Sequence, residues 1–139
     1  MMAECDACGF KEIAHTADLA LHVWAPDLPA LLSTAIQGMQ TLMGLTFALG
    51  TPLERSITVD GFDREGLLVS ALAEILYLVQ SERLGVITCH AQVFDGCLAL
   101  ALRMRFIDTL TREIKAVTYH GLSIQSTSHG LQATLVFDV

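Results

Sequence analysis

Two aspartates and the end of the chain are the residues in this sequence best suited to chemistry. Asp18 opens an alternating segment that runs to Trp24, and Asp138 ends another that begins at Leu131. Each aspartate falls on the less apolar face of its segment, so antiparallel pairing of the two strands would bring the carboxylates together. The α-carboxylate of Val139 would add a third anionic oxygen group. Three hard oxygen donors favour Ca²⁺ or Mg²⁺ over Zn²⁺.

The same residues also fit simpler interpretations, and the pattern alone leaves these open. Asp18 can cap a turn, and Asp138 can lie solvated at the fraying end of its strand, in which case there is no cation site. Lys115 begins another alternating segment. Its ammonium group can be solvated, or it can pair with a phosphate or with the two aspartates.

Cysteine and histidine patterns give weaker signals. Cys5 and Cys8 form a Cys-x-x-Cys pair ahead of a strand, whereas a structural zinc site needs four ligands and a redox pair favours a helix N-terminus. Cys89 and Cys97 fall on opposite sides of an expected hairpin, so we interpret all four as reduced thiols. No His-x-x-x-His, Gly-x-Ser-x-Gly or glycine-rich phosphate loop occurs. The usual hydrolase and nucleotidase templates therefore find no match.

The composition limits where the protein works and what it binds. The 139 residues suit one domain with one core, and their mean hydropathy is +0.52. The segment from Leu28 to Leu53 carries no charge, but glycines and prolines interrupt it, which favours a buried helix and loop over a membrane span. No secretory signal pattern opens the chain, so a cytoplasmic location and no membrane contact are expected.

The charge balance argues against independent nucleic-acid binding. Eight basic and fifteen acidic side chains give a net charge of −7, and the basic residues are scattered along the chain. A protein that grips a phosphate backbone alone normally presents a basic patch. If this protein works on RNA, we expect another molecule to hold the RNA.

Hydrophobic periodicity predicts an α+β fold with a mostly antiparallel sheet of about six to seven strands and two amphipathic helices packed on it. Asp27 and Asp63 are expected to cap the helices, which end near Gly44 and Ser81. The expected strands are 10–13, 19–24, 55–60, 85–94, 96–106, 115–126 and 131–138, with hairpins that turn at 95–96 and near 128–130. Residues 1–9 are expected to form a flexible leader and residues 10–139 a single domain.

An ordered set of motifs over residues 10–139 resembles the archease family. The matching segments are Phe10, His15-Thr16-Ala17-Asp18, Trp24, Gly38-Met39, Asp63 with Leu67-Leu68, Leu72-Ala73-Glu74-Ile75-Leu76-Tyr77, Lys115 to His120, and Phe137-Asp138-Val139. No single motif is specific, whereas the ordered set is. There are two departures: Ala14 replaces the carboxylate that usually precedes the histidine, and the family's acidic surface is only moderately developed.

The resemblance implies a function that the residues alone do not. Archeases are protein cofactors of a GTP-dependent RNA-splicing ligase used in tRNA splicing and RNA repair, so the chain would activate an enzyme without being one. Asp18, Asp138 and Val139 match the family's metal-binding group, and Lys115 matches its functionally needed lysine. His15 belongs to the first motif and is expected to act with these residues in activation. RNA would be reached only indirectly, through the ligase.

Two other functions remain as alternatives. The first is a chaperone-like modulator of a tRNA-modifying enzyme such as a methyltransferase, which would use an apolar surface near Leu28 to Leu53. The second is a metal-dependent phosphoesterase, for which the sequence positions neither a nucleophile nor a general base.

Overall fold

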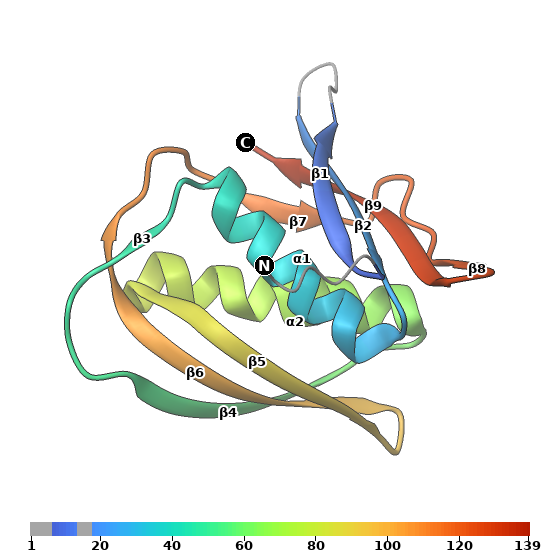
Figure 1. Ribbon diagram of the computed structural model, residues 1–139, viewed down its shortest axis with the longest axis horizontal. Helices are drawn as coiled ribbons and strands as arrows, with labels where there is room; N and C mark the ends of the chain where they lie inside the picture. Colours follow the sequence, from blue (N-terminus) through green and yellow to red (C-terminus); the bar gives the residue numbers. More distant parts are fainter. Residues whose placement is uncertain (1–6, 14–17) are drawn as a thin grey trace.

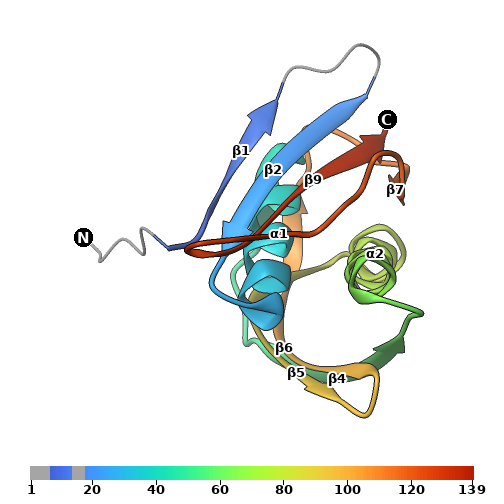
Figure 2. The same ribbon diagram turned by 90° about the vertical axis from the view of Figure 1, so that its right-hand side faces the viewer.

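Two antiparallel sheets enclose the helices in the structure, a computed structural model that describes residues 7–13 and 18–139 (Figures 1 and 2). In the described residues, the first sheet has the order β1 (Gly9–Ile13), β2 (Leu19–Ala25), β9 (Gly130–Asp138) and β7 (Ala116–Thr118), and β8 (Gln125–Thr127) also pairs with β9. The second sheet contains β3 (Thr46–Phe47), β4 (Leu53–Asp60), β5 (Leu84–Phe94) and β6 (Cys97–Thr109). Helices α1 (Leu28–Leu42) and α2 (Arg64–Tyr77) lie between the two sheets.

Both helices begin at the predicted caps. The Asp27 carboxylate accepts a hydrogen bond from the Ala30 amide at 2.9 Å, and Asp63 accepts one from the Gly66 amide at 2.8 Å. These bonds satisfy amide groups that have no partner within the helix. The α+β fold class with two helices and antiparallel strands is confirmed.

The position of α1 explains the uncharged segment that follows Asp27. Because α1 packs on β2 of one sheet and on β5 of the other, apolar and small residues are needed around most of its circumference. A Cβ atom added at Gly38 would lie 2.6 Å from a methyl group of Leu21, so the helix and β2 approach each other closely. Among the described residues, no helix has the length and apolar character that crossing a bilayer requires.

Three parts of the architecture differ from the sequence-based expectation in detail. The nine strands of the described residues form two sheets, where the sequence predicts one sheet of about six to seven strands, because the helices are covered on both sides. The strand expected over 115–126 is divided into β7 and β8, because the chain turns at Gly121 (φ +63°) and the Leu122 amide bonds to the Tyr119 carbonyl at 3.0 Å. The second helix stops being α-helical at Tyr77 and continues as a π-helical turn, Leu78–Glu82. The turn at Asp95-Gly96 has positive φ at both residues, as a type I′ hairpin requires.

Candidate functional site

The register of the first sheet brings the predicted carboxylates to one end of it. β2 and β9 are antiparallel and Leu19 pairs with Phe137, so Asp18 and Asp138 are the next two residues outward. On the other side of β9, Ala116 pairs with Asp138, and the Lys115 amide donates a hydrogen bond to the Asp138 carbonyl at 2.7 Å. Asp18 and Lys115 therefore flank Asp138 on its two sides. We call Asp18, Lys115, Asp138 and Val139 the tip.

The donor set of the tip is chemically suited to a hard divalent cation. Asp138 is exposed and Asp18 half-buried, and residues opposite one another on antiparallel strands project to the same face of a sheet. Within residues 7–13 and 18–139, no group of three or more His, Cys, Asp or Glu side chains is placed to hold a metal ion. The tip has two such side chains, and the third donor expected from the sequence is the Val139 carboxylate.

The structure describes only some of the other residues that the sequence singles out. Lys115 is exposed. His15 lies outside the described residues, as does Cys5 of the Cys-x-x-Cys pair. Cys8 is half-buried near the start of β1.

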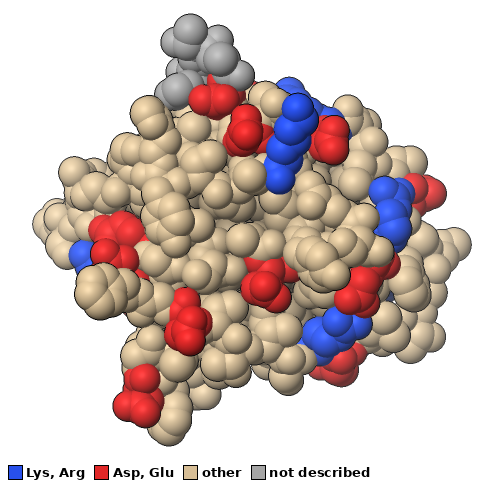
Figure 3. Space-filling view, turned by 180° about the vertical axis from the view of Figure 1, so that it is seen from behind, with Lys and Arg blue, Asp and Glu red and all other residues tan. Residues whose placement is uncertain are grey.

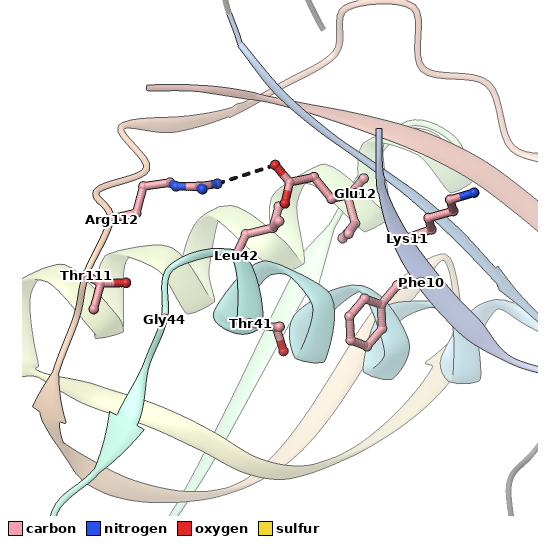
Figure 4. Close-up of a pocket in the computed structure, with 9 residues that line it drawn as sticks. Phe10, Lys11, Glu12, Thr41, Leu42, Gly44, Thr111 and Arg112 are labelled. Carbon is pink, nitrogen blue, oxygen red and sulfur yellow. Dashed lines mark ion pairs between the residues drawn. The ribbon is translucent and has the colours of Figure 1, made fainter. Parts of the chain in front are cut away.

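A cavity of about 490 Å³ lies between β1, the end of α1 and the loop that leads to Lys115 (Figure 4). Glu12 from β1 and Arg112 from this loop point toward one another across it, with Oε2 and Nη1 3.6 Å apart. Lys11 extends to the opposite side of β1. The ion pair thus links the strand that precedes Asp18 to the loop that precedes Lys115.

Sequence reasoning missed the contact between Glu12 and Arg112. The two residues are far apart in the chain and belong to no motif, so no local pattern could indicate their contact. Both side chains are about half exposed, at 50% and 46%, and such surface pairs contribute little to stability. The ion pair lies between β1, which precedes Asp18 in the chain, and the loop that precedes Lys115.

The surroundings of the remaining histidine and cysteine candidates fit structural roles and not catalytic or metal-binding ones. His22 Nδ1 lies 3.0 Å from Thr134 Oγ1, which fits the expectation of a histidine satisfied within its strand. Burial raises the pKa of the Cys89 thiol to about 11, which disfavours the reactive thiolate. Cys97 pairs with Phe94 at the start of β6, whereas Cys89 pairs with Leu102. The structure therefore places the two cysteines in different parts of the sheet.

Basic side chains lie beside acidic ones on one face of the molecule. On the face in Figure 3, Lys and Arg side chains lie beside Asp and Glu side chains instead of gathering into one basic area. Arg55 contacts Glu82 at 3.0 Å, and Arg103 contacts Glu54 at 3.5 Å. The hydrogen bond from Arg55 lowers the pKa of the Glu82 carboxyl.

Comparison with known proteins identifies relatives along nearly the whole chain. A sequence model of the Archease protein family matches residues 10–139. The chain is 30% identical over 135 residues to protein archease of Archaeoglobus fulgidus, a match that covers 94% of this chain and 98% of that protein. It is 28% identical to probable protein archease of Mycobacterium tuberculosis, over 94% of this chain and 75% of that protein.

Solved structures share the fold. The solution structure of Methanobacterium thermoautotrophicum protein 1598 superposes with a TM-score of 0.68 at 23% identity, over 94% of this chain and 99% of that one. The crystal structure of a Thermotoga maritima protein, described as an archease and possible chaperone, gives a TM-score of 0.67 at 21% identity. That match covers 93% of this chain and 96% of the Thermotoga chain.

Proposed function

The chain belongs to the archease family, and we propose that it is a non-catalytic activator of a GTP-dependent RNA-splicing ligase. The observation that carries this proposal is the strand register, which places Asp18 and Lys115 on either side of Asp138. An activator that reaches into another protein's site needs its functional groups at an accessible end of a rigid element. The end of a sheet held by β2, β9 and β7 meets that requirement.

The tip residues have separate roles in this proposal. The carboxylates of Asp18 and Asp138, with that of Val139, would hold Ca²⁺ or Mg²⁺, for which oxygen donors are the preferred ligands. A divalent ion held there supplies positive charge beside phosphate oxygens of a nucleotide. Lys115 contributes a mobile ammonium group of the same sign, and its backbone bond to Asp138 keeps it beside the carboxylates. His15 would act with them from the segment before Asp18.

In this proposal the protein activates the ligase by positioning groups in the ligase active site. We propose that the tip enters the active-site cleft of the ligase, orders metal and nucleotide there, and speeds formation of the ligase–guanylate intermediate. The ligase would carry the RNA, and this protein would allow repeated turnover. The net charge of −7 complements a basic RNA-binding partner, and such complementarity mainly raises the rate of association.

The proposal is tested by RNA joining over many turnovers with limiting ligase, with and without this protein. The wild type should raise the number of turnovers, and Asp18→Ala and Asp138→Ala should each remove most of the increase. If both variants stimulate joining as well as the wild type, the tip mechanism is wrong. If none of the three proteins stimulates joining, the ligase is not the client.

A chaperone-like function is the second candidate, and one observation favours it. Leu49, in the uncharged segment, is fully exposed, although the α1 part of the segment is buried between the sheets. The Thermotoga relative is also described as a possible chaperone. A chaperone-like modulator of a tRNA-modifying enzyme predicts concentration-dependent oligomers in gel filtration. The tip mechanism predicts one species whose elution does not change with concentration.

A further inference from the structure

One peptide group at the base of the tip, the group that joins Ile114 to Lys115, is held on both of its sides. The Ile114 carbonyl accepts a hydrogen bond from Gln80 Nε2 at 2.6 Å. The Lys115 N–H donates one to the Asp138 carbonyl at 2.7 Å. Because a peptide group is planar and its C=O and N–H point in opposite directions, the two bonds fix a single rigid unit. That unit connects Gln80 to two residues of the tip.

The strand that carries Lys115 into the sheet depends on α2 for support. β7 has three residues and lies at the end of the strand order, paired with β9. Only alternate residue pairs of an antiparallel ladder exchange hydrogen bonds, so so short a strand has few of them. α2 packs against β7 (Figure 2). Farther along the chain, the Ile124 amide donates to Glu65 at 2.8 Å, and the Ile124 carbonyl accepts from Arg64 at 3.1 Å.

The bond from Gln80 is the counterpart of these two bonds on the other side of β7. Arg64 and Glu65 belong to the first turn of α2, whereas Gln80 follows its last residue. The helix and its continuation therefore hold the chain before β7 and after it. The side chains of Ile114 and Ile124 are buried in the core, which fixes the two backbone positions that α2 bonds.

The π-helical turn Leu78–Glu82 directs Gln80 toward this peptide group. The hydrogen bonds of a π-helix join residues five apart, so a π turn rotates the side chains that follow around the helix axis, relative to a regular α-helix. Val79 remains buried, while Gln80 reaches the loop before β7. The turn is joined to the second sheet at its end, because Arg55 of β4 contacts Glu82 at 3.0 Å. Turns of this kind often occur at functional sites.

The contact of Gln80 differs from the other side-chain contact of the same loop. The pair of Glu12 and Arg112 joins two charged side chains that are about half exposed, at 50% and 46%. Each of these side chains can move without moving the backbone. Gln80 instead bonds to the backbone itself, at a residue whose side chain is fully buried. Its bond therefore determines how the chain is directed into Lys115.

We propose that Gln80 is a positioning residue of the tip, a role that rests on the activator function proposed above. Gln80 acts through the peptide group between Ile114 and Lys115, which sets the direction in which the Lys115 side chain leaves the backbone. Without the bond, this peptide group can rotate, and the Lys115 ammonium group and the Asp138 carbonyl lose their fixed relation. Fewer encounters with the ligase would then place the ammonium group correctly, and small misplacements of this kind lower rates strongly.

The first test uses the isolated protein and follows the Lys115 amide by hydrogen exchange in NMR spectra. Gln80→Glu keeps the shape of the side chain, but a carboxylate cannot donate to a carbonyl, whereas Gln80→Lys restores a donor. The Lys115 amide should exchange about fivefold faster in Gln80→Glu than in the wild type, as expected for the loss of one hydrogen bond, and Gln80→Lys should reverse most of this change. The amides of β2 serve as the internal reference. Equal exchange of the Lys115 amide in the wild type and Gln80→Glu would refute the proposal.

The second test measures the rate of ligase guanylylation against the concentration of this protein. Gln80→Glu should lower the maximal rate about fivefold and leave the concentration for half-maximal stimulation unchanged, because a misplaced tip still binds. Gln80→Lys should retain most of the stimulation. A merely structural effect would instead reduce the amount of folded protein, which raises the half-maximal concentration and leaves the maximal rate unchanged.

The controls separate this role from charge effects and from the activator function. Gln92→Glu and Gln92→Lys make the same changes of charge at an exposed position of β5 and should behave like the wild type. Thermal unfolding by circular dichroism checks each fold. If the wild type stimulates the ligase and Gln80→Glu reaches the same maximal rate, the role of Gln80 alone is refuted. If the wild type gives no stimulation, the activator function fails, and the role of Gln80 fails with it.

Discussion

At the level of single residues, the proposed metal site depends on two carboxylates, Asp18 and Asp138, which the register of β2 and β9 brings to one end of the sheet. Asp138→Asn keeps the shape of the side chain and removes its charge, so we expect Ca²⁺ or Mg²⁺ binding to weaken at least about tenfold. Isothermal titration calorimetry measures this directly. Asp95→Asn is the matched control, because Asp95 is an exposed carboxylate on the β5–β6 turn. Equal metal binding by both variants would remove Asp138 from the site.

The half-buried thiol of Cys89 gives a pH-dependent prediction. Its pKa is raised from 9.0 to about 11 because burial disfavours the charged thiolate. The folded protein should therefore react slowly with iodoacetamide at Cys89 at pH 8, and the rate should rise as the pH approaches 11. Peptide mass spectrometry, with urea-unfolded protein as the reference, measures the rate. An equal rate in folded and unfolded protein at pH 8 would show that the thiol is not protected.

The site could be predicted only in part from sequence, for reasons visible in its residues. Asp18 and Asp138 lie at the ends of two segments in which polar and apolar residues alternate. The alternation assigns each aspartate to a face of its strand, and antiparallel pairing of the two strands then predicts that the aspartates lie close together. Glu12 and Arg112 meet through the path of the loop after β6, which no local pattern encodes. The metal and the contact with a ligase remain predictions.

At the scale of elements, one buried side chain joins α1 to the second sheet. The Gln40 carboxamide accepts a hydrogen bond from the Val86 amide at 2.7 Å and donates one to the Val86 carbonyl at 3.0 Å. These bonds satisfy the backbone of β5 beside its irregular register between Val86 and Thr88. The polar side chain thus supplies partners for both backbone polar groups of Val86.

Gln40→Ala should therefore destabilise the fold by about 3 kcal/mol, since two buried backbone groups lose their partners. Urea denaturation followed by circular dichroism measures this loss. Gln37→Ala on the same helix is exposed and should change the free energy of unfolding by less than about 0.5 kcal/mol. A similar small effect for both variants would mean that water replaces the Gln40 bonds.

The elements themselves were largely predictable, and their assembly was less so. Caps and hairpin turns depend on local chemistry, so Asp27, Asp63 and Asp95-Gly96 mark the correct boundaries. The periodicity of α1 did not indicate that the helix would be covered from both sides, because a buried helix face has the same hydrophobic pattern whichever sheet contacts it. The division of the strands into two sheets is likewise a long-range property. The short β3 strand has too few residues to produce a pattern.

At the scale of the whole molecule, net charge and shape suit a protein that works on a larger partner. The tip occupies one end of the first sheet, where β9 ends near the C-terminus (Figure 1). If the negative charge steers this protein to a basic ligase, the association rate constant should fall steeply as salt rises from about 50 to 500 mM, while dissociation changes little. Stopped-flow mixing measures both rates. An association rate independent of salt would exclude electrostatic steering.

Activation through the tip is tested by the rate of ligase guanylylation with GTP and metal, measured in the presence of this protein or its variants. We expect the wild type and Asp95→Asn to accelerate guanylylation equally, and Asp138→Asn, folded by circular dichroism, to give little acceleration. If Asp138→Asn accelerates guanylylation as much as the wild type does, the tip carboxylates do not act in activation and the proposed mechanism is wrong.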